Sequence, residues 1–184
     1  MTGADELVEW VDDDDRLIEV VPRSRMRAEN LLHRSVAVIV TTTDGRLVVQ
    51  RRADHKDLFP GWWDIGAGGV VAAGEDLTTA ACRELAEELG VAVDVTELDD
   101  LGVGRHDDDQ AREICRVFSV TSDGPFVAVD GEASEIRTVD PDEFTALVAR
   151  EPFLPGSLAL LLPHVPRLVA ESAVRRDLDA PPTM

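Results

Sequence analysis

The chain has 184 residues, a length typical of one domain, and 44% of them are hydrophobic, which is enough to bury a core. Acidic residues outnumber basic ones by 37 to 18, and the resulting net charge of −19 opposes binding to nucleic-acid backbones or to anionic membranes. We therefore expect a small soluble ligand as the partner, with no nucleic acid and no membrane, and a homodimer stays open as the oligomeric state.

The sequence also excludes several classes of segment. Its start, MTGADELVEW, is acidic, and no apolar run approaches the roughly 20 residues of a membrane span, so we expect no secretory signal and a cytoplasmic location. Two cysteines, Cys82 and Cys115, cannot by themselves build a disulfide framework or a structural zinc site. Both are expected to be buried, reduced thiols.

The first third of the chain is predicted to form mainly β-structure. Apolar and β-branched runs at 7–11 and 16–21 flank four aspartates and predict an N-terminal hairpin, followed by a short helix at 24–30. Two further runs, at 36–42 and 46–52, are joined by an Asp-Gly turn that predicts a second hairpin.

The rest of the chain mixes helices and strands. A helix is expected over 76–89, because apolar residues recur there every four positions and Gly90 ends the pattern. The further expected elements are strands at 98–103, 115–120 and 136–139, helices at 142–150 and 157–169, the last bent or broken by Pro163 and Pro166, and a loose ending from 175. This pattern predicts an α/β fold with a mixed central sheet between helices, extended by the N-terminal hairpin. One domain is expected over 1–175, with a flexible tail over 176–184.

The predicted helix at 76–89 carries an unusual concentration of charge. Glu84, Glu87 and Glu88 lie on adjoining rows of one face, and Arg83 alone cannot neutralise them. A divalent cation would relieve this repulsion, since Mg²⁺ and Mn²⁺ prefer carboxylate oxygen as ligand. Glycines just before the helix would let the backbone approach a ligand closely.

The spacing around this helix matches a known motif. Five residues separate Gly69 from Glu75, and seven separate Glu75 from the run Arg83-Glu84-Leu85-Ala86-Glu87-Glu88-Leu89-Gly90. This pattern resembles the Nudix box of the Nudix hydrolase superfamily, which binds a divalent metal and a diphosphate. The resemblance implies a Nudix-type α/β/α sandwich. It also implies that Glu84, Glu87, Glu88 and the Gly69 carbonyl ligate Mg²⁺, or Mn²⁺ in its place, with Arg83 holding the glutamates and Glu75 supporting the site.

Further segments resemble one branch of that superfamily, the isopentenyl-diphosphate-isomerase-like proteins. They are Leu32-His33-Arg34-Ser35, Gln50-Arg51-Arg52, Lys56 and Pro60-Gly61-Trp62-Trp63, and with the box the similarity spans about 10–140. The isomerases carry a catalytic cysteine where this chain has Gly68, and histidines of their second metal site would fall on His33, Met26 and Val70. We therefore expect hydrolysis of a diphosphate linkage in a nucleoside diphosphate derivative or similar molecule. Isomerase-like activity and a non-catalytic nucleotide-sensing role are the alternatives.

Residues outside the box are candidates for the remaining roles. Arg51, Arg52 and Lys56 follow a predicted strand and are expected to bind substrate phosphate or to lie on the surface. The general base is expected to be Glu84 or a glutamate of the segment at 130–135, either Glu132 or Glu135. Trp62 and Trp63 are expected to fill the core rather than to stack on a base.

Overall fold

The computed structural model describes residues 6–56, 58–129 and 131–179. Its elements, in chain order, are β1 (Leu7–Val11), β2 (Leu17–Pro22), α1 (Arg23–Ala28), β3 (His33–Thr41), β4 (Leu47–Arg52), β5 (Trp63–Ile65), β6 (Ala67–Val70), α2 (Leu77–Leu89), η2 (Val95–Glu97), β7 (Asp99–Asp107), β8 (Arg112–Thr121), β9 (Ala133–Val139), α3 (Pro141–Arg150), α4 (Pro155–Leu160) and α5 (Val165–Asp179). The expected α/β architecture with a mixed sheet between helices is confirmed.

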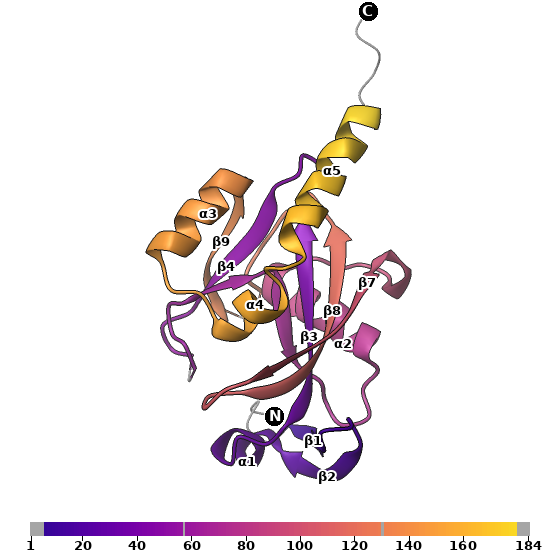
Figure 1. Cartoon of the computed structure of the whole chain (residues 1–184), viewed down its shortest axis with the longest axis vertical. Helices are drawn as coiled ribbons and strands as arrows, with labels where there is room; N and C mark the ends of the chain where they lie inside the picture. The colour runs from indigo at the N-terminus through magenta and orange to yellow at the C-terminus, as the bar shows by residue number, and fades with distance from the viewer. Residues whose placement is uncertain (1–5, 57, 130, 180–184) are drawn as a thin grey trace, which may run out of the picture.

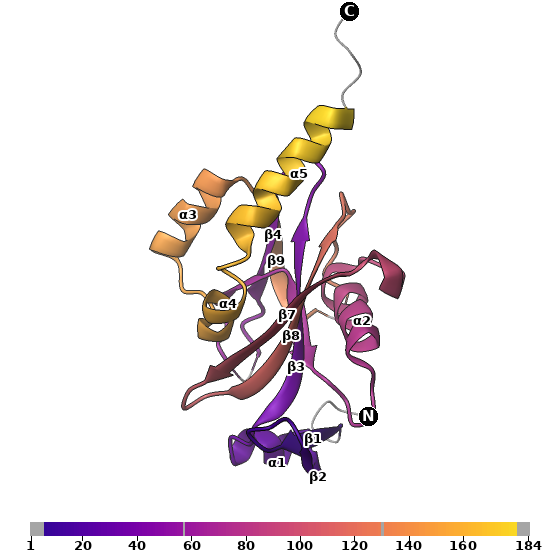
Figure 2. The same cartoon turned by 45° about the vertical axis from the view of Figure 1, so that its right-hand side comes forward.

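Strand β3 lies at the centre of the sheet and sends side chains into two cores. Val36, Val38 and Val40 pack with the apolar face of α2, whereas Ile39 packs on the opposite side with residues of α3, α4 and α5. Figure 2 shows α2 on one side of the sheet and α4 and α5 on the other. Because both faces are covered, the strand is a continuous apolar run rather than an alternating one.

The pairing of β3 brings distant parts of the chain together. β3 pairs in parallel with β8 along its whole length, and antiparallel with β6 from Ser35↔Val70 to Val38↔Ala67. Strand β7 extends the sheet beyond β8. The Asp-Gly turn does join β3 to β4, as expected, but only Thr41 and Leu47 pair across it. Beyond that point β4 leaves β3 and pairs with β5 and β9.

The predicted N-terminal hairpin is confirmed, and it carries α1 to one end of the molecule. β1 pairs with β2 along both strands and contacts β3 where Trp10 pairs with His33. Met26 of α1 is buried in a small third core with residues of β1, β2 and β6. In Figure 1 the hairpin and α1 lie together at the lower end of the sheet, below β3.

The helical region expected over 157–169 is broken, as its prolines indicated. It forms two helices, α4 and α5, with Pro163 in the turn between them, since proline cannot continue a helical hydrogen-bond ladder, whereas Pro166 lies in the first turn of α5. The loose ending expected from 175 is helical as far as Asp179, and the rest of the expected tail, 180–184, lies outside the described residues. Along the described ranges, no helix has the length and apolar character needed to cross a membrane.

Candidate active site

Helix α2 is fixed at both ends by its own sequence. The Asp76 side chain accepts hydrogen bonds from the backbone N–H groups of Thr78, at 2.9 Å, and Thr79, at 3.2 Å, and so caps the N-terminus. Gly90 ends the helix with a φ of 69°, a left-handed conformation that glycine adopts without strain. Because Leu85 and Leu89 are fully buried beneath it, the helix presents its charged face away from the core.

Arg83 organises that charged face. Its guanidinium donates to both carboxylate oxygens of Glu75, at 2.9 and 3.0 Å, and to Glu84 and Glu87, at 2.7 and 3.1 Å. The bonds to Glu75, above all, raise the pKa of Arg83, and the same bonds lower the pKa of Glu75. Arg83 is therefore charged at every physiological pH and contacts two of the box glutamates.

Glu88 is held by a different set of donors. Its Oε2 accepts from the Gln50 amide, at 2.8 Å, and from the Gly68 backbone N–H, at 3.0 Å. Burial, together with the nearby carboxylates of Glu84 and Asp64, raises the pKa of Glu88 to about 8. In the sequence, Gln50 stands in the segment Gln50-Arg51-Arg52, whose resemblance to the isomerase-like proteins implies no role for this residue. A polar residue directly after the apolar run Leu47-Val48-Val49 of a predicted strand was the signal.

Two glycines let the backbone approach the glutamates. A Cβ built on Gly69 would overlap the Glu84 carboxylate, so only glycine leaves room for that side chain. At Gly68 a Cβ would come within 2.6 Å of the Val36 carbonyl oxygen on the neighbouring strand. A cysteine at position 68 would therefore require the backbone of β3 or β6 to shift.

The donor set fits a divalent metal by its chemistry. Burial raises the pKa of Glu84 as well as that of Glu88, which reflects two carboxylates forced together away from water. A hard cation would offset both the burial and the repulsion. Within the described ranges no three acidic, histidine or cysteine side chains are already grouped closely enough to hold a metal. Glu84 and Glu87 form ion pairs with Arg83 instead, so metal binding would require at least one of these ion pairs to open.

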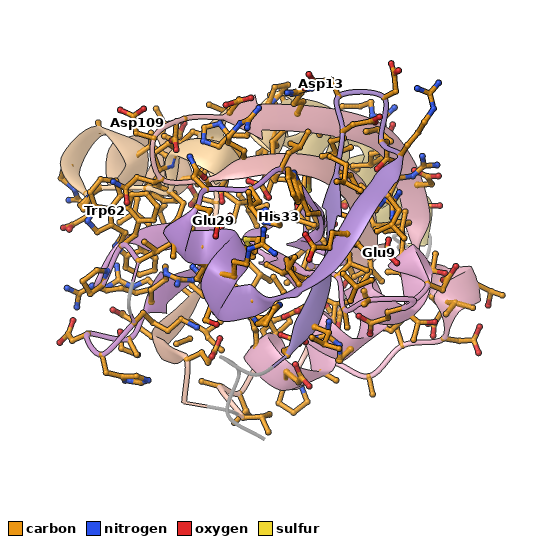
Figure 3. The ribbon with its side chains drawn as sticks, turned by 90° about the horizontal axis from the view of Figure 1, so that it is seen from below. Glu9, Asp13, Glu29, His33, Trp62 and Asp109 are labelled. Carbon is orange, nitrogen blue, oxygen red and sulfur yellow. The ribbon has the colours of Figure 1, made fainter. Side chains whose placement is uncertain are left out.

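The charged face of α2 opens into a cavity of about 500 Å³. Its walls come from α1, the first half of β3, the end of β4 and the loop after it, β5, β6, α2, the β7–β8 turn and the start of α4. The cavity thus lies between the start of β3 and the end of β4, where the two strands are no longer paired. Figure 3 looks onto this end and shows His33 near the centre beside α1, with Trp62 and Asp109 toward one margin.

The three predicted substrate-binding cations differ in whether they line the cavity. Arg52 and Lys56 line the cavity. Arg51 donates to the Gly61 carbonyl at 2.9 Å and Arg52 to the Leu58 carbonyl at 3.1 Å, so both arginines shape the loop between β4 and β5. Arg51 is absent from the described residues that line the cavity.

The two candidate bases from the segment at 130–135 also differ in position. Strand β9 begins at Ala133, earlier than expected, so Glu135 lies within it, opposite Arg51, and forms an ion pair with Arg137 at 2.5 Å. Glu132 precedes the strand, lines the cavity and forms an ion pair with Lys56. Burial alone would raise the pKa of Glu132, but the nearby cations Lys56, Arg23 and Arg52 together lower it. Asp130 lies outside the described residues.

Two carboxylates in the cavity were missed by the sequence analysis. Asp64 accepts a hydrogen bond from Ser157, and Glu113 accepts one from Ser35 at 2.5 Å. Burial raises the pKa of both carboxyl groups. In the sequence each is an isolated acidic residue, Asp64 in the three-residue β5 and Glu113 near the start of β8, and only the contact between distant strands brings it into the cavity.

The remaining aromatic and histidine positions have structural explanations. Trp63 is buried and stacks on Phe153 with 6.4 Å between ring centroids, as expected for the core, whereas Trp62 packs on Phe59 at 5.0 Å. His33 is buried with its Nδ1 at 2.9 Å from the Leu31 carbonyl oxygen, and burial lowers its pKa to about 4. Met26 and Val70, the positions of the other two histidines in the isomerases, are both buried in the third core. Within the described part of the chain, no histidine cluster therefore surrounds His33.

Comparison with known proteins identifies similar sequences and folds. The model of the NUDIX domain family matches residues 31–160. A protein of Pseudomonas aeruginosa named as an uncharacterized Nudix hydrolase is 38% identical over 156 residues, which are 85% of this chain and 91% of that protein.

Two solved structures resemble the fold. A crystal structure of a protein from Deinococcus radiodurans has a TM-score of 0.72 at 24% identity and covers 89% of this chain and 99% of its own. The NUDIX domain of Shewanella oneidensis NrtR, in a cocrystal structure with ADP ribose, has a TM-score of 0.60 at 17% identity and covers 80% of this chain and 99% of its own. At these identities the structures support the fold alone.

Proposed function

Because the chain belongs to the Nudix hydrolase family, we propose that it hydrolyses a diphosphate linkage within a small molecule, with Mg²⁺ as the cofactor and Mn²⁺ as the alternative. The observation that carries this proposal is the charged face of α2. Arg83 aligns Glu84 and Glu87 there, beside a buried Glu88, at the wall of a cavity of about 500 Å³. That volume lies in the range of small-molecule sites, about 300–1,000 Å³.

Each residue of the site has a distinct task in this proposal. Glu84, Glu87, Glu88 and the Gly69 carbonyl would hold the cation, which when bound supplies charge neutralisation on the diphosphate and a water of lowered pKa. Arg83, anchored on Glu75, keeps Glu84 and Glu87 in place. Gln50 of strand β4 orients Glu88 of helix α2.

The substrate and the attacking water need further groups from the cavity wall. Arg52 and Lys56 are positioned to bind phosphate oxygens, the first as a planar fork and the second as a point charge. Glu132 is the candidate base that accepts the proton of the attacking water, once its ion pair with Lys56 opens. Glu84 is the alternative base within the box. We propose a nucleoside diphosphate derivative as substrate, and the ADP ribose bound by the NrtR domain is consistent with that class.

The two alternative functions have weaker support. Isomerase-like chemistry would require a cysteine at position 68, where the Val36 carbonyl leaves no room for a Cβ. A nucleotide-sensing role rests on the likeness to the NrtR domain, which concerns the fold. Against it, every position of the box motif is intact in this chain.

The proposal can be tested with the purified chain and Mg²⁺ on nucleoside diphosphates, dinucleotides and isoprenoid diphosphates. Glu87→Gln and Glu88→Gln should lose most turnover on any substrate found, with little loss of stability, because neither creates a core cavity. Glu171→Gln, at an exposed position of α5, is the matched control and should keep full activity. Equal turnover in wild type and box variants, unaffected by a chelator, would contradict the proposal.

A further inference from the structure

The ring of His33 has one nitrogen that no described residue binds. His33 is only 6% exposed, and it lines the cavity from the first position of β3. Its Nδ1 lies 2.9 Å from the Leu31 carbonyl oxygen, whereas Nε2 forms no hydrogen bond within residues 6–56, 58–129 and 131–179. Over the same ranges, every side-chain nitrogen or oxygen that is fully shielded from solvent does have a hydrogen-bond partner. Nε2 is therefore not fully shielded, and it opens into the cavity.

The Leu31 carbonyl determines which nitrogen of this ring carries the hydrogen. A carbonyl oxygen only accepts hydrogen bonds, so Nδ1 donates, and in the neutral ring Nε2 then presents a lone pair. Burial keeps the ring neutral at physiological pH, because it lowers the pKa of His33 to about 4. The cavity thus contains a hydrogen-bond acceptor with a fixed direction, and no described residue uses it.

This lone pair can bind only some groups of a substrate. Phosphate oxygens are acceptors themselves, so His33 faces a part of the substrate other than the diphosphate. A metal ion would need further ligands, and the described residues place no group of three acidic, histidine or cysteine side chains there. The nucleoside diphosphate derivative proposed above offers two kinds of neutral donor, the hydroxyls of its sugar and the amino group of its base.

The side chains beside His33 favour a sugar hydroxyl. His33 is in register with Glu113 of β8, whose carboxyl group also lines the cavity and binds the Ser35 hydroxyl at 2.5 Å. Bases are commonly bound by stacking on aromatic side chains. Among the described residues that line the cavity, the one phenylalanine, tryptophan or tyrosine is Phe59, in the loop between β4 and β5. The wall formed by β3 and β8 is therefore polar and has no ring on which a base would stack.

We propose that the Nε2 atom of His33 accepts a hydrogen bond from a ribose hydroxyl of the substrate, which makes His33 a specificity-determining residue. The inference rests on the proposed function, because it takes a nucleoside diphosphate derivative as the substrate. It adds that the wall at the start of β3 recognises the sugar. A substrate without that hydroxyl would leave the acceptor unpaired inside the cavity, and leaving a buried acceptor unpaired is more costly than an ordinary hydrogen bond is stabilising.

ADP, 2′-deoxy-ADP and 3′-deoxy-ADP are matched probes, because they share one diphosphate linkage and differ by single hydroxyls. With the wild-type chain and Mg²⁺, kcat/KM should be about tenfold lower for one of the deoxy compounds than for ADP. In His33→Asn this ratio should approach one, because the shorter amide can still donate to the Leu31 carbonyl but does not reach the place of Nε2. His33→Gln, whose amide does reach that place, should restore part of the preference.

The control and the contrary outcomes follow from the same assay. His55→Asn, at an exposed position outside the described lining of the cavity, should keep the full preference. Equal kcat/KM for the three compounds in the wild type, or an unchanged ratio in His33→Asn, would overturn the inference. Inosine diphosphate lacks the amino group of ADP. A preference for ADP over inosine diphosphate that disappears in His33→Asn would assign Nε2 to the base and would overturn the ribose assignment.

A measurement on the ring itself separates this inference from the proposed function. Nitrogen-15 NMR of the metal-free chain reports which nitrogen of His33 carries the hydrogen, and its signals are assigned through their absence from His33→Gln. We expect the hydrogen on Nδ1, and saturating ADP should shift the Nε2 signal even if ADP is not hydrolysed. A hydrogen on Nε2 in the free chain, or an unchanged Nε2 signal with ADP, would overturn the inference. Hydrolysis of all three compounds at equal rates would refute it alone and leave the proposed function standing.

Discussion

The amide of Gln50 joins strand β4 to helix α2, because the same nitrogen donates to the Glu88 carboxylate at 2.8 Å and to the Gly66 carbonyl at 3.0 Å. Both side chains are buried, with 4% of Gln50 and 5% of Glu88 exposed. Glu88 is thus oriented by a residue outside the box motif. Residues that orient metal ligands in this way affect the site without touching the metal.

Gln50→Leu should therefore weaken the binding of Mg²⁺ at the site. Leucine fills a similar volume but leaves Glu88 with Gly68 as its remaining donor, so the carboxylate loses its fixed direction. We expect an apparent Mg²⁺ affinity about 10–100-fold lower, measured from turnover across a Mg²⁺ titration. Thr145→Leu, at an exposed position of α3, is the control. An unchanged Mg²⁺ midpoint in Gln50→Leu would show that Glu88 needs no such support.

The two glutamates of the segment before and within β9 should differ in their effect on catalysis. Glu132→Gln should lower kcat by at least about tenfold with little change in metal affinity, because Glu132 lines the cavity. Glu135→Gln should keep full kcat, because Glu135 is paired with Arg137 on the strand. The measurement is kcat across the pH range for both variants. Full kcat in both would assign the base to Glu84 or to hydroxide already bound to the metal.

Gly69→Ala should abolish most activity without unfolding the chain. The added methyl group would overlap the Glu84 carboxylate and displace it, and a misplacement of about 1 Å costs about a hundredfold in rate. Gly74→Ala is an informative contrast to Gly69→Ala. Gly74 has a φ of 76°, and no atom lies within 4 Å of a Cβ added there. That variant should lose stability and keep its activity. A fully active Gly69→Ala would mean that Glu84 tolerates displacement.

His33 should make the stability of the fold depend on acidity. Its pKa is about 4 in the folded chain and 6.5 in the unfolded chain, so the unfolded chain takes up the proton first as the pH falls. The contribution of His33 to the free energy of unfolding is fully present above pH 6.5. It is lost as the pH falls toward 4, and the loss amounts to up to about 3 kcal/mol. Urea unfolding at pH 7 and pH 4.5 should show a smaller difference for His33→Gln than for wild type. His55→Gln, at an exposed position, should behave as wild type; an unchanged pH dependence in His33→Gln would contradict the prediction.

The parts of the fold that depend on local sequence were predictable. The helix over 76–89 was expected within one residue of its observed start, because its cap, its apolar stripe and its terminal glycine all lie within the segment. The same holds for the N-terminal hairpin. The ends of the later helices were less predictable, because Pro163 permits a break at several nearby positions and packing on the sheet selects one of them.

The site was predictable only where its members are close in sequence. The contacts of Arg83 with Glu75, Glu84 and Glu87 all fall within one motif, and they are observed. Contacts that join elements distant in the sequence, such as Gln50 of β4 with Glu88 of α2 or Ser35 of β3 with Glu113 of β8, leave no local pattern. Glu132 and Glu135 show the same limit, because the start of β9 decides which one enters the cavity, and that start depends on pairing with β4.

The parallel pairing of β3 with β8 also bears on how the chain reaches its native state. The pair joins residues 33–41 to residues 113–121, and the box helix lies between them in the sequence. Contacts between segments so far apart in the chain form slowly, because closing a long loop costs chain entropy before the native hydrogen bonds form and offset that cost. During synthesis, α2 therefore emerges before the strand that completes the sheet beneath it. A nascent chain that ends before Arg112 already carries all the box glutamates but lacks the central strand pair on which their arrangement depends.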